Sequence, residues 1–265
     1  MEYLFSQKEK PQNILSDKFI LLLLDYDGTL TPIAESPAIA TLSKENKDLL
    51  KRLSKNTNCS LAIISGRSLE DIKSTIGLRG VIYAGNHGLE IEGPKIKFES
   101  QVSLRLKSVI HNIAEELPKR LAGIKGVLIE DKGLTLSIHY RLVDKEDLPA
   151  FEKIISEVTS LYTVRDKIKV NSGKKVYEIK PPVQWDKGKV VLWLMARQQF
   201  ISGAKKVLPV YIGDDITDED AFNALKRKGL TVFVGEPGNS KADYYLKNTE
   251  EVTKFLRLIM DLKPI

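Results

Sequence analysis

Two carboxylates stand at the end of an apolar run near the start of the chain. Asp25 and Asp27 follow the four leucines of 21–24, and Gly28 comes directly after them. Residues two apart on a strand point to the same side, so both carboxylates can converge from a strand end while Tyr26 points away. An isolated Asp-x-Asp-Gly is more often a solvated acidic turn than a catalytic one. The interpretation therefore depends on the rest of the chain.

A second acidic cluster follows another apolar stretch, and it contains Asp214, Asp215 and Asp218. Carboxylates held close together repel one another unless a cation lies between them, and hard oxygen ligands suit Mg²⁺. We expect the ligands to be Asp25, the main-chain carbonyl of Asp27, and Asp214. Asp215 and Asp218 are expected around them, and the sequence leaves open whether Asp218 binds the metal directly or through water.

These residue types predict phosphoryl transfer. A cation beside Asp25 would let this carboxylate attack phosphorus and form an aspartyl-phosphate. Asp27 is then left as the general acid for the leaving alcohol and as the base for water. Ser65 and Gly66 at one helix start can hold a phosphate oxygen, and Lys187 at another can neutralise charge on the phosphate and the nucleophile. Each motif alone is also an ordinary turn or a solvated lysine, but chance seldom gives this set in this order.

Acidic residues also begin helices for purely structural reasons. Glu219 and Asp220 lie at such a start, and for them we favour helix capping over chemistry.

The elements that must position these residues alternate between strand and helix. Strands are expected at 21–24, 60–64, 81–84, 207–212 and 230–234, with helices after Ser43, at 69–76, from 185 onward and around 252–259. This order predicts an α/β fold, a doubly wound, mostly parallel sheet whose ligands gather at the carboxyl ends of the strands. Asn86 and His87 lie on a tight loop at such an end, so we expect them to contact substrate.

Residues 102–182 break this order. They contain an amphipathic helix at 104–121, strands at 126–130 and 134–141, a helix around 148–158, and strands at 168–171 and 175–180. We expect a small α+β unit inserted as a cap between the two halves of a catalytic core, 1–101 and 183–265.

Composition excludes several classes of function. The 265 residues are 42% hydrophobic and 29% charged, which is ordinary for a globular protein. No stretch reads as a signal peptide or a membrane helix, so we expect a cytoplasmic protein without membrane contact. The net charge of +6 could indicate nucleic acid. However, residues 101–180 intersperse 15 Lys and Arg with 11 Asp and Glu and lack a stripe of stacking aromatics, which favours a compact anionic ligand.

Taken together, the motifs resemble those of the haloacid dehalogenase-like phosphatases, and they are most similar to the trehalose-6-phosphate phosphatase family. The matching segments are Asp25-x-Asp-Gly-Thr-Leu-Thr-Pro, Ser65-Gly-Arg, Lys187-Gly and Gly213-Asp-Asp-x-Thr-Asp-Glu-Asp. The resemblance implies a doubly wound core, a mobile cap, Mg²⁺ dependence, and hydrolysis of the sugar phosphate trehalose 6-phosphate to trehalose and phosphate. It also implies a functional link to trehalose-6-phosphate synthase, and we expect a monomer. The first 18 residues lie outside the pattern.

Further segments match the same family. Its substrate is a disaccharide, which binds best to charged donors and acceptors that are fixed in place. The expected substrate contacts are Gly66, Arg67, Asn86, His87, Glu130, Lys132, His139, Arg141, Lys174 and Glu178. His139 and Arg141 alternate with apolar residues, as on any solvated sheet face, so that interpretation stays open. Glu178 can instead pair with a neighbouring lysine.

Two other functions remain open at this point. A phosphatase for sucrose phosphate or a glycosyl-3-phosphoglycerate would differ only in the cap. A non-catalytic, cation-dependent binding module would keep the fold but lose part of the chemical set, and this chain retains all of it.

Overall fold

The computed structural model describes residues 1–6, 10–34, 39–173, 175–203 and 206–262. The chain divides into two compact units, Met1–Phe98 with Trp185–Ile265, and Glu99–Gln184. The sequence placed the second unit at 102–182, and its role as a cap stays a prediction. None of the helices within the described ranges has the length and apolarity needed to cross a membrane.

A nine-stranded sheet forms the centre of the first unit in the described part of the chain, in the order β1-β13-β12-β11-β2-β3-β4-β5-β6. Its strands are β1 (Glu2–Tyr3), β2 (Phe19–Leu24), β3 (Cys59–Ile64), β4 (Ile82–Gly85), β5 (Glu90–Gly93), β6 (Ile96–Glu99), β11 (Val207–Gly213), β12 (Leu230–Val234) and β13 (Tyr244–Leu246). β2 lies between β3 and β11 and is parallel to both. The carboxyl ends of β2 and β11 therefore meet at one edge of the sheet, as predicted.

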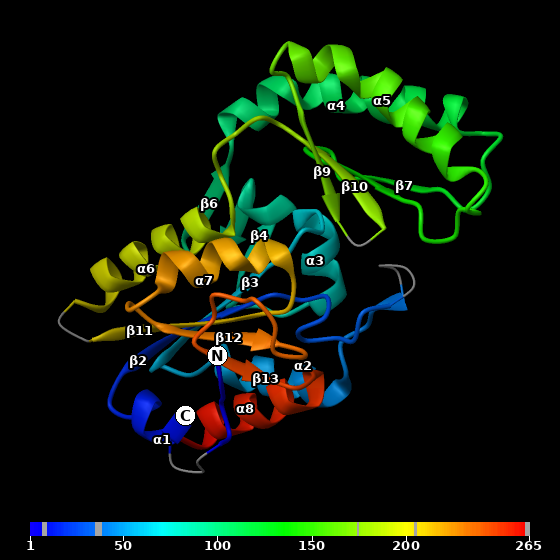
Figure 1. Cartoon of the computed structure of the whole chain (residues 1–265). Coiled ribbons are helices and arrows are strands. Elements are labelled where there is room, and N and C mark those ends of the chain that lie inside the picture. Colours follow the sequence, from blue (N-terminus) through cyan, green and yellow to red (C-terminus); the bar gives the residue numbers. More distant parts are fainter. Residues whose placement is uncertain (7–9, 35–38, 174, 204–205, 263–265) are drawn as a thin grey trace. The chain divides into compact units, whose positions relative to one another are not determined.

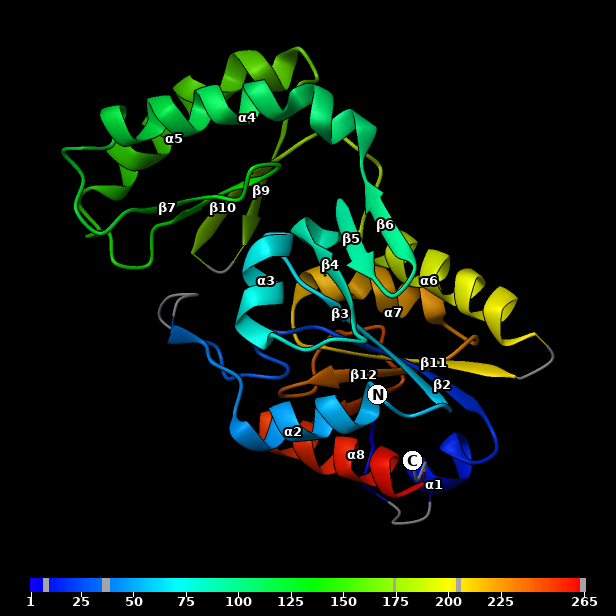
Figure 2. The same cartoon turned by 180° about the vertical axis from the view of Figure 1, so that it is seen from behind.

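Helices cover both faces of this sheet, as Figures 1 and 2 show from opposite sides. The helices of this unit are α1 (Lys10–Leu15), α2 (Lys44–Leu53), α3 (Leu69–Ile76), α6 (Lys187–Ser202), α7 (Glu219–Leu225) and α8 (Thr249–Leu262). α6 and α7 pack on one face, and α1, α2, α3 and α8 pack on the other. This arrangement confirms the doubly wound α/β fold.

The leucine run of β2 is buried on both faces. Leu22 and Leu24 pack with α2 and α8, whereas Leu21 and Leu23 pack with α6, and all four are 0% exposed. Each such burial contributes about 1.5–3 kcal/mol relative to an exposed side chain. A strand covered by helices on both sides needs apolar residues at every position, which explains the unbroken run.

The helix ends follow local signals in the sequence. Ser43 caps α2, since its hydroxyl accepts from the main-chain N–H of Asn46. Ser68 caps α3 in the same way, and α3 ends at Gly77, whose φ of 64° is left-handed. Asp186 accepts from the N–H of Lys189 and begins α6. These caps fix where the first turns of α3 and α6 lie.

Short elements at the edges of the sheet were missed by the sequence analysis. β5 pairs antiparallel with β4, and β1 pairs with β13, which brings the first residues into the sheet. Leu4 and Leu15 are fully buried in the core. Strands of two to four residues carry too little periodicity to be recognised, and their pairing depends on tertiary contacts.

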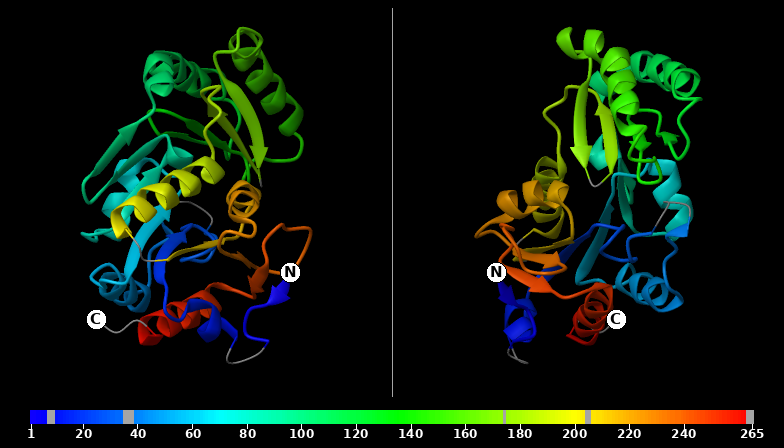
Figure 3. Two further views of the ribbon diagram at one scale, coloured as in Figure 1. Left: turned by 90° about the vertical axis from the view of Figure 1, so that its left-hand side faces the viewer. Right: turned by 45° about the vertical axis from the view of Figure 1, so that its right-hand side comes forward.

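Within the described residues, the second unit is a four-stranded antiparallel sheet, ordered β7-β8-β10-β9, with two helices packed on one face (Figure 3). Its elements are α4 (Gln101–Arg120), β7 (Leu128–Asp131), β8 (Leu136–His139), α5 (Leu148–Val164), β9 (Lys169–Gly173) and β10 (Val176–Lys180). Ile129, Ile138 and Ile179 contact the helices. The residues that alternate with them therefore point to the opposite face.

Candidate active site

Three buried carboxylates meet where β2 and β11 end. One oxygen from each of Asp25, Asp214 and Asp218 lies within 4.8 Å of the others. Asp25 directly follows β2, and the other two lie in the turn after β11, of which Ile216–Asp218 forms a short 3₁₀ helix. Clustered carboxylate oxygens are the ligands that hard divalent cations prefer. The donor set therefore fits a metal ion.

Lys187 brings a cation into this cluster from the first turn of α6. Its Nζ lies 2.6 Å from Oδ1 of Asp25 and 2.7 Å from Oδ1 of Asp218. The Lys187 side chain is only 3% exposed. The two carboxylates keep this buried ammonium charged, because their attraction outweighs the effect of burial on its pKa.

Asp218 anchors the turn after β11. Its Oδ1 accepts from Lys187 and from the hydroxyl of Tyr211, the latter at 2.6 Å. Its Oδ2 accepts from the main-chain N–H groups of Asp214 and Asp215, at 3.0 and 2.9 Å. A carboxylate offers about four lone-pair positions, and these four donors match them. The contacts of Asp218 thus fix the position of Asp214.

The close carboxylates perturb one another's titration. Burial raises the pKa of Asp25 well above its usual range, although Lys187 acts to lower it. Burial also raises the pKa of Asp214 to about 7, and the charge of Asp218 adds to this effect. For Lys187, burial lowers the pKa, but Asp218 and Asp25 more than offset this and hold it well above its usual value. The cluster therefore favours added positive charge, from protons or from a metal ion.

Gly28 is required for this close approach. Its φ is +87°, and a Cβ at this position would lie 2.1 Å from Oδ2 of Asp214. Thr29 donates from its hydroxyl to Oδ1 of Asp214 at 3.2 Å and is fully buried. The Gly-Thr pair after the two aspartates thus shapes the site of Asp214.

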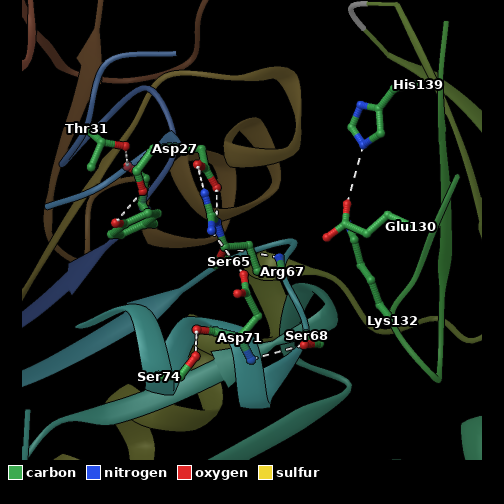
Figure 4. A network of polar contacts seen from close by, with 12 residues as sticks. Asp27, Thr31, Ser65, Arg67, Ser68, Asp71, Ser74, Glu130, Lys132 and His139 are labelled. Atoms are coloured by element: carbon green, nitrogen blue, oxygen red, sulfur yellow. Dashed lines mark hydrogen bonds and ion pairs between the residues drawn. The ribbon is translucent and has the colours of Figure 1, made fainter. Parts of the chain in front are cut away.

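Asp27 is held by Arg67, as Figure 4 shows. The Nε and Nη2 of Arg67 donate to the two carboxylate oxygens of Asp27, at 2.8 and 2.6 Å. Its Nη1 donates to Asp71 at 3.0 Å. The guanidinium carbon also lies 4.9 Å from the ring centre of Tyr26, whose pKa is raised by burial to about 12, so its hydroxyl stays neutral.

The Ser65-Gly66 loop is tied to the turn that contains Asn86 and His87. The N–H of Asn86 donates to the carbonyl of Arg67, and the N–H of His87 donates to that of Ser65. A Cβ on Gly66 would lie 2.8 Å from the His87 ring. Both turn residues are left-handed, with φ of 50° and 56°, a strain that is common at functional sites.

The polar residues of this loop differ in what they contact. Ser65 is buried, and its Oγ accepts from the N–H of Arg67, which leaves the hydroxyl hydrogen able to donate. Asn86 is fully buried and donates from its side-chain amide to Glu90 at 2.7 Å, so it supports the turn. His87 is half-buried. Their roles in binding a substrate stay predictions.

In the second unit, three of the expected residues lie together. Glu130 Oε2 is 3.4 Å from His139 Nε2 and 3.7 Å from Lys132 Nζ. Glu178 faces Ser137, which in turn faces Glu130 across β8. All of these lie on the face opposite α4 and α5.

This face differs in part from the expected half-exposed strand. Thr135 and Ser137 are buried, and β8 ends at His139, so exposed Arg141 lies beyond it. Lys174 lies outside the described residues.

Several residues of the site were missed by the sequence analysis. Tyr211 lies two residues before Gly213 on β11, and alternation along the strand is a weak signal for it. Asp71 stands four residues after Arg67, a helical spacing that predicts ion pairs. Glu219 and Asp220 lie in the first turn of α7, as expected, and Glu219 also accepts from the main-chain N–H of Lys241 at 2.8 Å.

Comparisons with known proteins agree with this site. A model of the trehalose-phosphatase family matches residues 23–250. Trehalose-phosphate phosphatase B of Arabidopsis thaliana is 34% identical over 263 residues, which cover 95% of this chain and 69% of the relative. The C-terminal domain of the Candida albicans trehalose-6-phosphate phosphatase has a TM-score of 0.77 at 26% identity, covering 95% of this chain and 97% of that one.

The fold extends to more distant proteins. A haloacid dehalogenase-like hydrolase from Bacteroides thetaiotaomicron has a TM-score of 0.61 at 19% identity, over 91% of this chain and 100% of that one. The chain therefore belongs to the trehalose-phosphatase family, on the haloacid dehalogenase-like fold.

Proposed function

We propose that this protein hydrolyses trehalose 6-phosphate to trehalose and phosphate. The observation that carries the proposal is the buried contact of Asp25 with Lys187, beside Asp214 and at the carboxyl end of the central strand. A nucleophilic carboxylate needs a nearby positive charge before an anionic phosphate can approach it. Lys187 supplies one such charge.

A second positive charge is proposed to come from Mg²⁺, held by Asp25, Asp214 and the main-chain carbonyl of Asp27. When bound, this ion supplies charge that offsets the repulsion between the nucleophile and the phosphate. Asp218 already accepts from four donors, so it acts through the turn that carries Asp214 rather than as a direct ligand. The hard oxygen donors support the choice of Mg²⁺.

The reaction then proceeds in two steps. A carboxylate oxygen of Asp25 forms a bond to phosphorus as the bond from phosphorus to the sugar oxygen breaks, and the leaving oxygen takes a proton from the Asp27 carboxyl group. In the second step Asp27 accepts a proton from water, whose oxygen attacks phosphorus and releases Asp25 and phosphate. Ser65 and the N–H of Gly66 are proposed to hold the phosphate oxygens.

The second unit, near 102–182, is proposed to recognise the sugar. Glu130, Lys132 and His139 form a group of charged and polar atoms on one sheet face, and Glu178 lies on the same face. Such fixed donors and acceptors suit the hydroxyls of a disaccharide. The link to a synthase, the monomeric state and the cytoplasmic location stay predictions from the sequence.

Phosphate release across a panel of sugar phosphates with Mg²⁺ tests the proposal. We expect trehalose 6-phosphate to exceed glucose 6-phosphate and sucrose 6-phosphate by at least about 100-fold in kcat/KM, because the added sugar contacts act in the transition state. Asp25→Asn is expected to lose at least about 1000-fold in kcat. Asp48→Asn, an exposed position on α2, is the matched control. Equal turnover of all substrates would contradict the specificity, and an active Asp25→Asn would contradict the covalent step.

A further inference from the structure

All three guanidinium nitrogens of Arg67 donate to carboxylates of the protein. Its side chain is 5% exposed, and Nε, Nη2 and Nη1 each donate to a carboxylate oxygen of Asp27 or Asp71. Planar two-point contacts of this kind fix direction as well as distance. The Asp27 side chain is 41% exposed, so without such a contact it would sample several rotamers.

Other contacts hold Arg67 in place from two sides. Ser68 caps α3 by accepting from the N–H of Asp71, which sets the first turn of the helix and directs the Asp71 carboxylate to Arg67 (Figure 4). Beneath the guanidinium lies the buried ring of Tyr26, whose hydroxyl donates to the carbonyl of Ala40 at 3.0 Å. The group is therefore fixed before any ligand arrives.

We propose that Arg67, anchored by Asp71, is a positioning residue that sets the orientation of the Asp27 carboxylate for proton transfer. This inference rests on the proposed function, in which Asp27 is the acid and the base. It gives Arg67 a role other than the substrate binding that the sequence suggested. The proton moves between Asp27 and the leaving oxygen or water, while Arg67 keeps all of its own protons.

Arg67→Lys is the sharpest variant because lysine keeps the charge but cannot make the two-point contact. A misplacement of about 1 Å in a reacting group costs about 100-fold in rate, so we expect kcat for trehalose 6-phosphate to fall about 10- to 100-fold. KM is expected to stay within about twofold. Asp71→Asn, which weakens only the anchor, is expected to lower kcat about threefold to tenfold.

An aryl phosphate separates the two chemical steps. Nitrophenolate leaves without a proton, so phosphoryl transfer from p-nitrophenyl phosphate to Asp25 does not need Asp27, whereas the attack of water on the intermediate does. We expect Arg67→Lys to release the first equivalent of nitrophenolate within about threefold of the wild-type rate, followed by steady turnover slowed about 10- to 100-fold. Asp27→Asn is expected to show the same burst with still slower turnover.

Controls make the outcomes distinct. Glu92→Gln removes an ion pair that Glu92 makes with Lys73 of α3, and it is expected to change neither phase. Circular dichroism and thermal unfolding check each variant, and Asp71→Asn carries the test if Arg67→Lys does not fold. If Asp27→Asn keeps full turnover, the proposed role of Asp27 fails, and the inference fails with it.

Other results would overturn the inference and leave the proposed function standing. A large loss in Asp27→Asn with no loss in Arg67→Lys and Asp71→Asn would show that Arg67 does not position the carboxylate. A raised KM for both substrates at unchanged kcat, or a burst slowed as much as turnover, would show that Arg67 acts on the phosphate instead.

Discussion

Replacing Lys187 by methionine removes the cation from a buried group of three carboxylates while keeping most of the side-chain volume. In the wild-type structure Nζ contacts Asp25 at 2.6 Å and Asp218 at 2.7 Å. Asp218 is 0% exposed and Asp25 6%. Neither carboxylate can turn to water, so the variant must bury both with one fewer positive charge.

The size of the effect follows from this burial. Removing one partner of a buried ion pair typically costs about 3–5 kcal/mol, because the other charge is left unpaired. Burial raises the pKa of Asp25, and that of Asp214 reaches about 7. A raised carboxyl pKa in the folded state costs stability as pH rises through that pKa. We therefore expect the variant to lose the full amount of stability at about pH 8 and less at about pH 5.5, where protons on the carboxylates replace the missing positive charge.

Urea unfolding followed by tryptophan fluorescence measures this loss directly. Both tryptophans, Trp185 and Trp193, belong to the unit that carries the site, so the signal reports on that unit. Saturating Mg²⁺ is expected to restore part of the stability of the variant, since the ion also supplies positive charge to Asp25 and Asp214.

A matched control lies on the same helix turn. Lys189→Met, at an exposed position, is expected to change stability by less than about 0.5 kcal/mol at either pH. If Lys187→Met lost less than about 1 kcal/mol at pH 8 without metal, the buried ion pairs would not hold the cluster together, and the reasoning would be refuted.

Three further predictions concern the metal and the sugar. Gly28→Ala is expected to weaken Mg²⁺ binding at least about tenfold by calorimetry, because its Cβ would meet Asp214 at 2.1 Å; unchanged affinity would contradict this. The rise in melting temperature caused by Mg²⁺ is expected to grow as pH increases through about 7, because protons on Asp214 compete with the ion; a shift independent of pH would argue against that site. Glu130→Gln is expected to raise KM for trehalose 6-phosphate about tenfold and to leave KM for p-nitrophenyl phosphate unchanged. An equal rise in KM for both substrates would contradict this prediction.

Much of the fold could be predicted because its signals are local. A few neighbouring residues are enough to identify one element in each case: the unbroken leucines for β2, the Ser43 cap for α2 and the terminal Gly77 for α3. The sheet order at the edges could not be predicted. β1 and β13 are two and three residues long, and their pairing depends on tertiary contacts between segments that are far apart in the sequence.

The sequence by itself determined the candidates for the chemistry, since Asp25, Asp214 and Lys187 belong to motifs with recognisable types and order. Tertiary structure decided how they are used. Asp218 is fully engaged by four donors, and Arg67 binds two aspartates, because only the folded chain brings these groups within hydrogen-bond distance. Residue type limits what a side chain can donate or accept, but its partners depend on contacts between distant segments, which spacing along the chain does not encode.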